Sequence, residues 1–176
     1  MAAVEIRFGD LLDQTDVEVV VNAWNRNFIP WWLLLPSGVS GAIKRRGGYA
    51  PFRELRRVGF LAAGDAVVTG AGRLPYRAII HVAALNALWR SSDKIIRRCT
   101  ESALNIAVTR RFASVGFPVI GAGTGGVPEE IALAAISETV AKHQFDGKVV
   151  LVRYRRSNLL EPSPGHEIEI RQKDSE

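Results

Sequence analysis

Short apolar runs alternate along the chain with longer segments of helical periodicity. The short runs are β-branched and bounded by turn residues, so we expect strands at Val4–Phe8, Val17–Val21, Ala66–Thr69, Ala78–Val82, Val115–Ile120 and Val149–Val152. A helix is expected after Ser91-Ser92-Asp93, which offers an N-cap, and another with Pro128 as its first residue. Strands that alternate with helices predict an α/β sandwich around a largely parallel sheet.

The length favours one domain with one sizeable core. The chain has 176 residues, of which 47% are hydrophobic and 23% charged, as is ordinary for a globular protein. The composition turns polar towards the C-terminus. We therefore expect a single domain over residues 1–156 and a polar tail over residues 157–176.

The charge and the cysteine content limit which ligands and which kinds of site the chain can have. The net charge is +5, which suits an anionic ligand, and the arginine pairs are spread along the chain rather than gathered into a nucleic-acid-binding arm. Cys99 is the only cysteine, which excludes an intrachain disulfide and a multi-thiolate metal site. The start does not look like a signal peptide, and no run approaches the ~20 apolar residues of a membrane span. We expect a cytoplasmic protein without a metal or cofactor.

A glycine-rich stretch between a predicted strand and a predicted helix is the clearest chemical motif. Its sequence is Gly121-Ala122-Gly123-Thr124-Gly125-Gly126. Glycines let backbone N–H groups approach an anion closely, and a helix N-terminus adds a favourable dipole, so the stretch predicts a phosphate cradle. The spacing also fits a dinucleotide-binding fingerprint, but that fold places the motif after its first strand, whereas here one helix and one strand remain.

Two further turns carry polar groups that could face a ligand. Ser37-Gly38-Val39-Ser40-Gly41 leads into a predicted helix, and a helix start again offers free N–H groups. Asn22 and Asn25 follow the second predicted strand, at the sheet edge where α/β proteins bind ligands. Either feature is also explained by local capping or by a turn.

Taken in order, these pieces resemble the macrodomain family. The resemblance rests on Gly9-Asp10-Leu11, Val21–Asn25, Gly38–Ile43, Leu74-Pro75 through Val82 and the glycine-rich stretch, and it spans about Val4 to Arg155. It implies a three-layer α/β/α fold with a mixed, largely parallel sheet. It also implies that ADP-ribose and mono-ADP-ribosylated proteins are the partners.

The resemblance assigns roles to individual residues. Asp10, with Leu11 beside it, matches the acid that binds the adenine amino group, and Tyr154 resembles an aromatic residue that packs on adenine. Asn25 matches the asparagine that contacts the distal ribose, and Asn22 supports that turn. Two diphosphate loops are implied. The first glycine loop comprises Ser37, Gly38, Val39, Ser40 and Gly41, and the second comprises Gly121, Ala122, Gly123, Thr124, Gly125, Gly126 and Val127.

Two departures from the family pattern bear on activity. MacroD-type hydrolases carry an aspartate where this chain has Ser40, and the terminal ADP-ribose glycohydrolases carry one where it has Gly125. A serine hydroxyl can hold a water but does not readily deprotonate one, because its pKa lies far above 7. The segment Arg26–Pro36 is longer than usual and contains Trp31 and Trp32. The segment is interpreted either as a cap on the core or as a wall over the distal ribose. Trp89 could border the same region.

The sequence leaves three possible functions. The first is a hydrolase that removes mono-ADP-ribose from acidic residues of modified proteins, with Asn25 and Ser40 as its catalytic residues. The second is a reader that binds ADP-ribose without hydrolysis, which the serine at position 40 favours. Nucleic-acid binding through the paired arginines is a third, less favoured alternative. His81 is interpreted as a packed structural residue in an apolar strand.

Overall fold

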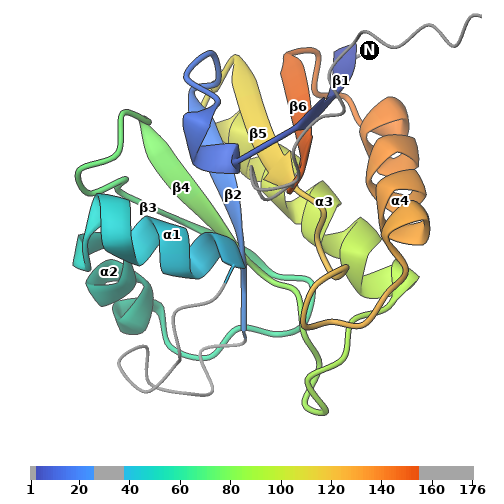
Figure 1. Cartoon of the computed structure of the whole chain (residues 1–176), viewed down its shortest axis with the longest axis horizontal. Helices are drawn as coiled ribbons and strands as arrows, with labels where there is room; N and C mark the ends of the chain where they lie inside the picture. The colour runs from blue at the N-terminus through green and yellow to red at the C-terminus, as the bar shows by residue number, and fades with distance from the viewer. Residues whose placement is uncertain (1–2, 26–37, 155–176) are drawn as a thin grey trace, which may run out of the picture.

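The computed structural model describes residues 3–25 and 38–154, which form one sheet with helices on both faces (Figure 1). The strands are β1 (Ala3–Phe8), β2 (Val19–Trp24), β3 (Ala66–Thr69), β4 (Ala78–Ala83), β5 (Ser114–Pro118) and β6 (Lys148–Arg153). The helices are the 3₁₀ turn η1 (Leu11–Asp13), α1 (Gly38–Gly47), α2 (Ala50–Val58), α3 (Asp93–Thr109) and α4 (Glu129–Lys142). Ser37, the Arg26–Pro36 segment and the tail predicted over residues 157–176 lie outside the described residues.

The six strands form a mixed sheet in the order β1-β6-β5-β2-β4-β3. Every neighbouring pair is parallel except β3 and β4, which run antiparallel. Helices α1 and α2 pack on one face, and α3 and α4 cover the other (Figure 1). This arrangement confirms the predicted three-layer α/β/α fold with a largely parallel sheet.

Each face of the sheet has its own apolar core. The α3 and α4 side is built on Ile96, Leu104 and Ile136, which pack against β-strand residues such as Phe117 and Leu151. The α1 and α2 side contains Leu12, Val20, Ile43, Phe52 and Leu55. Strands buried on both faces need near-continuous apolar sequence, which explains the runs from which the strands were predicted.

Several predicted boundaries were wrong. Asn22, expected in a turn after the second strand, lies inside β2, where its side chain has partners on two neighbouring elements. The predicted strand Val115–Ile120 ends instead at Pro118, whose ring nitrogen cannot donate to a sheet ladder. Pro128 is the N-cap of α4, not its first helical residue.

Helix α2 has no counterpart in the sequence predictions. Pro51 lies at its start, which fits the first turn of a helix, and Gly59 with a φ of 79° ends it. Only Phe52 and Leu55 bury large apolar side chains from this helix, so its apolar stripe is too short to be recognised from periodicity. Within the described residues, no helix is long and apolar enough to cross a membrane.

Candidate functional site

The predicted site residues gather at the carboxyl ends of four adjacent parallel strands. Gly9 and Asp10 follow β1, Tyr154 follows β6, the second glycine loop follows β5, and Asn25 follows β2. Because β1, β6, β5 and β2 are consecutive in the sheet, these segments form one row along one edge. Ser37 is the one predicted site residue that lies outside the described chain.

The row contains a topological switch point between β2 and β5. The two strands pair only at Val19 with Val115 and at Val20 with Gly116, so they share no ladder towards their carboxyl ends. The helix that follows β2 along the chain, α1, packs on one face of the sheet, and the helix that follows β5, α4, packs on the other. Open α/β sheets bind ligands at such a position, which we call the β2/β5 switch point.

The first turn of α1 is anchored to β2 beside this switch point. Ser40 Oγ donates a hydrogen bond of 2.8 Å to Asn22 Oδ1. Gly38 has a φ of 52°, a left-handed conformation that glycine adopts without strain, and a Cβ there would meet nothing within 4 Å. The first N–H groups of a helix have no partners within it, so Gly38, Val39 and Ser40, the first three residues of α1, present backbone donors at the same place. Gly41 is the fourth residue of the helix and is buried.

The second glycine loop is shaped by close packing on one side and is open on the other. A Cβ on Gly125 would lie 2.7 Å from both the Gly121 carbonyl oxygen and Ser91 Cβ, and a Cβ on Gly121 would lie 2.9 Å from Ser91 Oγ. In contrast, a Cβ on Gly123 or Gly126 would meet nothing within 4 Å. Glycine at 121 and 125 is therefore required by the fold, whereas Gly123 leaves open space beside the backbone.

Backbone N–H groups of this loop are available to an anion. The amides of Ala122, Gly126 and Val127 donate within the loop or to the residues that precede it. Within the described chain, the N–H groups of Gly123, Thr124 and Gly125 make no hydrogen bond. Three consecutive free donors can bind the oxygens of a phosphate, since successive backbone N–H groups form anion-binding concavities.

The opposite end of the row carries the residues expected at adenine. Asp10 caps η1 by accepting the Leu12 N–H at 2.8 Å, and its second oxygen lies 3.8 Å from Arg46 Nη1. The Leu11 side chain is buried in the core, which leaves its backbone as the part that can contact a ligand. Tyr154 is 71% exposed, so its ring is free of the core.

A buried lysine places positive charge close to the end of β2. Lys44, one helical turn after Ser40, lies 5.6 Å from the centre of the Trp24 ring and 5.1 Å from that of Phe52. Burial lowers the pKa of its ammonium group. A cation over two aromatic rings is stabilised by their π-electrons, and this one lies beside a predicted diphosphate site.

Sequence reasoning missed the polar partners behind the site. His81 is fully buried, as predicted, but it is also hydrogen-bonded between Asn22 and Thr69, at 3.0 and 2.9 Å. Asn22 lies opposite His81 in the β2–β4 ladder, and this register is not visible from sequence alone. Ser91 donates its backbone N–H to the Gly125 carbonyl, and its buried hydroxyl has no hydrogen-bond partner among the residues that the structure describes.

Chemically, the site offers donors and amides but few acids or bases. The first turn of α1 and the second glycine loop contain no aspartate or glutamate. Asn25 is buried directly after β2. Trp89 is 40% exposed and has a φ of 59°, in a connection that joins β4 to α3 and contacts the second loop through Ser91. The arrangement suits binding of an anionic ligand more directly than proton abstraction.

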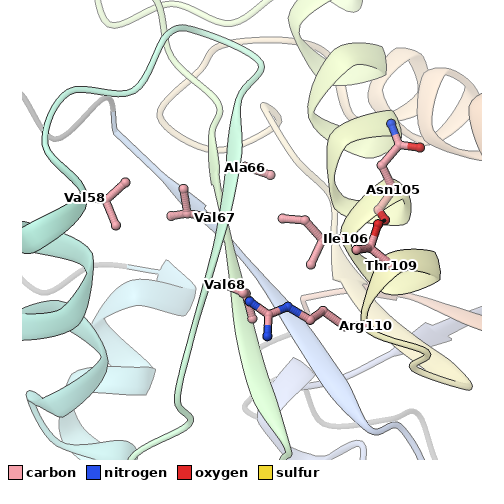
Figure 2. Close-up of a pocket in the computed structure, with 8 residues that line it drawn as sticks. All are labelled: Val58, Ala66, Val67, Val68, Asn105, Ile106, Thr109 and Arg110. Atoms are coloured by element: carbon pink, nitrogen blue, oxygen red, sulfur yellow. Dashed lines mark hydrogen bonds between the residues drawn. The ribbon is translucent and has the colours of Figure 1, made fainter.

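A separate hollow of about 450 Å³ lies at the edge strand β3 (Figure 2). Val58 of α2 and Val67 lie on one side of the strand, and the α3 residues Asn105, Ile106 and Thr109 lie on the other. The lining is mainly apolar and includes none of the predicted site residues. It is therefore separate from the β2/β5 switch point.

The chain is similar to several known proteins. The family model for the Macro domain matches residues 21–136, which include the carboxyl-terminal part of β2 and the second glycine loop. A protein of Citrobacter koseri named O-acetyl-ADP-ribose deacetylase is 33% identical over 163 residues, covering 86% of this chain and 88% of that protein. A protein of the same name from Escherichia coli K12 is 32% identical over 154 residues, covering 81% and 83%.

The fold is also similar to solved structures. The structure of an Oceanobacillus iheyensis macrodomain with ADP has a TM-score of 0.75 at 28% identity, covering 88% of this chain and 84% of that one.

Proposed function

The chain belongs to the macrodomain family, and we propose that it binds ADP-ribose at the β2/β5 switch point and removes it from acidic residues of modified proteins. The observation that carries the proposal is the set of free N–H groups on Gly123, Thr124 and Gly125, which follow β5 and so lie next in the sheet to β2, the strand that precedes α1. Two groups of backbone donors suit the two phosphates of one ligand. The ADP bound to the Oceanobacillus macrodomain supports this class of ligand.

The row of strand ends orients the proposed ligand. Asp10 and Tyr154, at the β1 and β6 end, would bind adenine through an accepting carboxylate oxygen and a stacked ring. Asn25, at the β2 end, would hold the distal ribose. The diphosphate then spans the middle of the row, over β5.

The proposed reaction needs positioning more than a strong base. Water adds to C1″ of the distal ribose or to the ester carbonyl, and the bond between ribose and the glutamate or aspartate breaks. Both routes release ADP-ribose, a free carboxylate and one proton, which passes to solvent. In the C1″ route the leaving group is a carboxylate, which departs readily, so on this route a rigidly held water can suffice where Ser40 replaces the usual aspartate.

The names of the relatives support an ester substrate. O-acetyl-ADP-ribose, in the names of the Citrobacter and Escherichia proteins, also carries an acyl ester on ribose. We therefore expect acyl linkages to be cleaved in preference to bonds that join ADP-ribose to nitrogen.

A reader function is the second candidate, and Ser40 is the observation that favours it. A reader would bind ADP-ribose with micromolar affinity and leave the modification in place. Calorimetry with ADP-ribose alongside an assay for release of the modification separates the two.

Replacing Gly123 by valine tests the phosphate cradle. We expect at least about a tenfold loss of ADP-ribose affinity, because the side chain would fill space through which a phosphate approaches the free N–H groups. The melting temperature should remain within a few degrees of wild type, since a Cβ there meets nothing within 4 Å.

Gly125→Ala is the contrasting variant. Its Cβ would collide with the Gly121 carbonyl oxygen, so a loss of stability is expected for this variant and not for Gly123→Val. Wild-type affinity in Gly123→Val, measured by calorimetry, would contradict the assignment of the second loop.

The adenine end can be tested separately through Tyr154. Tyr154→Ala should weaken ADP-ribose binding about fivefold, as expected for loss of one exposed stacking contact of about 1 kcal/mol. Affinity for ribose 5-diphosphate, which lacks adenine, should not change. An equal loss for both ligands would place Tyr154 elsewhere than at adenine.

A further inference from the structure

Four side chains form a continuous hydrogen-bonded chain from the site into the sheet. Ser40 Oγ contacts Asn22 Oδ1 at 2.8 Å, Asn22 Nδ2 contacts His81 Nδ1 at 3.0 Å, and His81 Nε2 contacts Thr69 Oγ1 at 2.9 Å. Thr69 Oγ1 then donates to the Gly70 carbonyl oxygen at 3.0 Å. The chain crosses from α1 through β2 and β4 to the edge strand β3.

The Gly70 end of this hydrogen-bonded chain fixes which group donates and which accepts in each of its hydrogen bonds. The Gly70 carbonyl can only accept, so it takes the hydroxyl proton of Thr69. Thr69 Oγ1 must then accept from His81 Nε2–H, which leaves Nδ1 of a neutral imidazole as an acceptor for the Asn22 amide. The Asn22 oxygen consequently faces Ser40 and takes its proton.

The surroundings of His81 keep the ring neutral and fixed. The side chain is fully buried, and burial lowers its pKa to about 3. Phe52 packs against the ring at a centroid distance of 5.9 Å in an edge-on arrangement. A doubly protonated ring would lose the hydrogen bond from Asn22, because Nδ1 would then be a donor facing another donor.

The direction of these hydrogen bonds determines whether Ser40 can donate to a ligand or only accept from it. Its proton is committed to Asn22, and within the described chain its oxygen accepts no hydrogen bond. The half-buried hydroxyl therefore presents only lone pairs to the switch point. Such a hydroxyl repels phosphate oxygens and binds a donor, so the Ser40 side chain, unlike the backbone N–H groups of the first turn of α1, gives the diphosphate no donor.

We propose that His81 is a positioning residue that, through Asn22, holds Ser40 as a hydrogen-bond acceptor for the attacking water. This rests on the proposed hydrolase function. In that reaction Ser40 orients the water by accepting one of its protons in a hydrogen bond, without removing it. Thr69 sets the tautomer of His81 from the opposite edge of the sheet.

The tautomer can be measured without any activity. Nitrogen NMR of the ¹⁵N-histidine-labelled protein should show His81 protonated at Nε2 and unprotonated at Nδ1. Thr69→Val removes the acceptor at Nε2 and should shift the proton towards Nδ1, whereas Thr69→Ser should keep the wild-type tautomer. A wild-type ring protonated at Nδ1 would overturn the proposal whether or not the protein is a hydrolase.

Kinetics then test the link to Ser40. Thr69→Val and Ser40→Ala should each lower kcat about tenfold and leave the ADP-ribose Kd within about twofold, and Thr69→Ser should restore turnover. The double variant should be no slower than Ser40→Ala, since both changes act on one group.

Two results would overturn the kinetic part. A further tenfold loss in the double variant would mean that Thr69 does not act through Ser40. A loss of ADP-ribose affinity as large as the loss of kcat would mean that Ser40 contacts a ribose hydroxyl instead of water. If wild type shows no turnover on any ADP-ribose ester, the hydrolase proposal itself fails. The NMR result still reports the direction of the hydrogen bonds from Ser40 to Thr69.

Discussion

Replacing Asn25 by alanine is expected to reduce the release of ADP-ribose from a glutamate-linked substrate by about 100-fold. Asn25 lies directly after β2 at the switch point, where its amide would fix the distal ribose relative to the incoming water. Misplacement of a reacting group by about 1 Å can cost this much in rate, because hydrolysis without a strong base depends on orientation. Steady-state release of labelled ADP-ribose measures the effect.

Asn105→Ala is the matched control. It removes the same amide from an exposed position of α3, where the side chain contacts His143 and lines the hollow at β3 (Figure 2). Its turnover should equal that of wild type. If Asn25→Ala retains both wild-type turnover and wild-type ADP-ribose affinity, the site is not at the end of β2.

Acidification should destabilise the fold through His81. In the unfolded chain this ring titrates near its ordinary pKa of 6.5, whereas burial lowers the folded pKa to about 3. The unfolded state therefore binds more protons throughout this window, and stability is lost as the pH falls through it. Between pH 7.5 and pH 5 the expected loss is about 2 kcal/mol.

Urea unfolding at a series of pH values measures this dependence. His81→Gln should be less stable at pH 7.5 but should lose most of the slope between pH 7.5 and pH 5. His143→Gln should change the slope less, because His143 is only partly buried and its pKa is lowered from a more solvated position. Below pH 5, carboxylates such as Asp16, whose pKa is lowered by hydrogen bonds from Arg7, add a loss of the same sign. A wild-type slope in His81→Gln would show that the ring is not buried in its neutral form.

The sequence predicted the layers of the fold and the position of the second glycine loop because those features are local. The strand Ala66–Thr69 was predicted with its observed bounds, since three of its four residues are β-branched and turn residues flank it. The second glycine loop was placed correctly after a strand and before a helix. Both follow from composition over a few consecutive residues.

What the sequence did not predict depends on contacts between distant segments. Asn22 in an apolar run indicates a turn unless partners exist for its amide, and those partners come from α1 and from β4. The hydrogen-bonded role of His81 depends on the register of β2 against β4. The different roles of Gly123 and Gly125 likewise depend on Ser91, which packs against one side of the loop only.

The most direct test of the account is release of ADP-ribose from a glutamate-linked mono-ADP-ribosylated protein by wild type and by Gly123→Val in parallel. We predict that wild type removes the label and that Gly123→Val, with the same fold, removes it at least about tenfold more slowly at subsaturating substrate. A label that persists with wild type, together with micromolar binding of ADP-ribose at the same site, would contradict hydrolysis of this linkage and favour a reader.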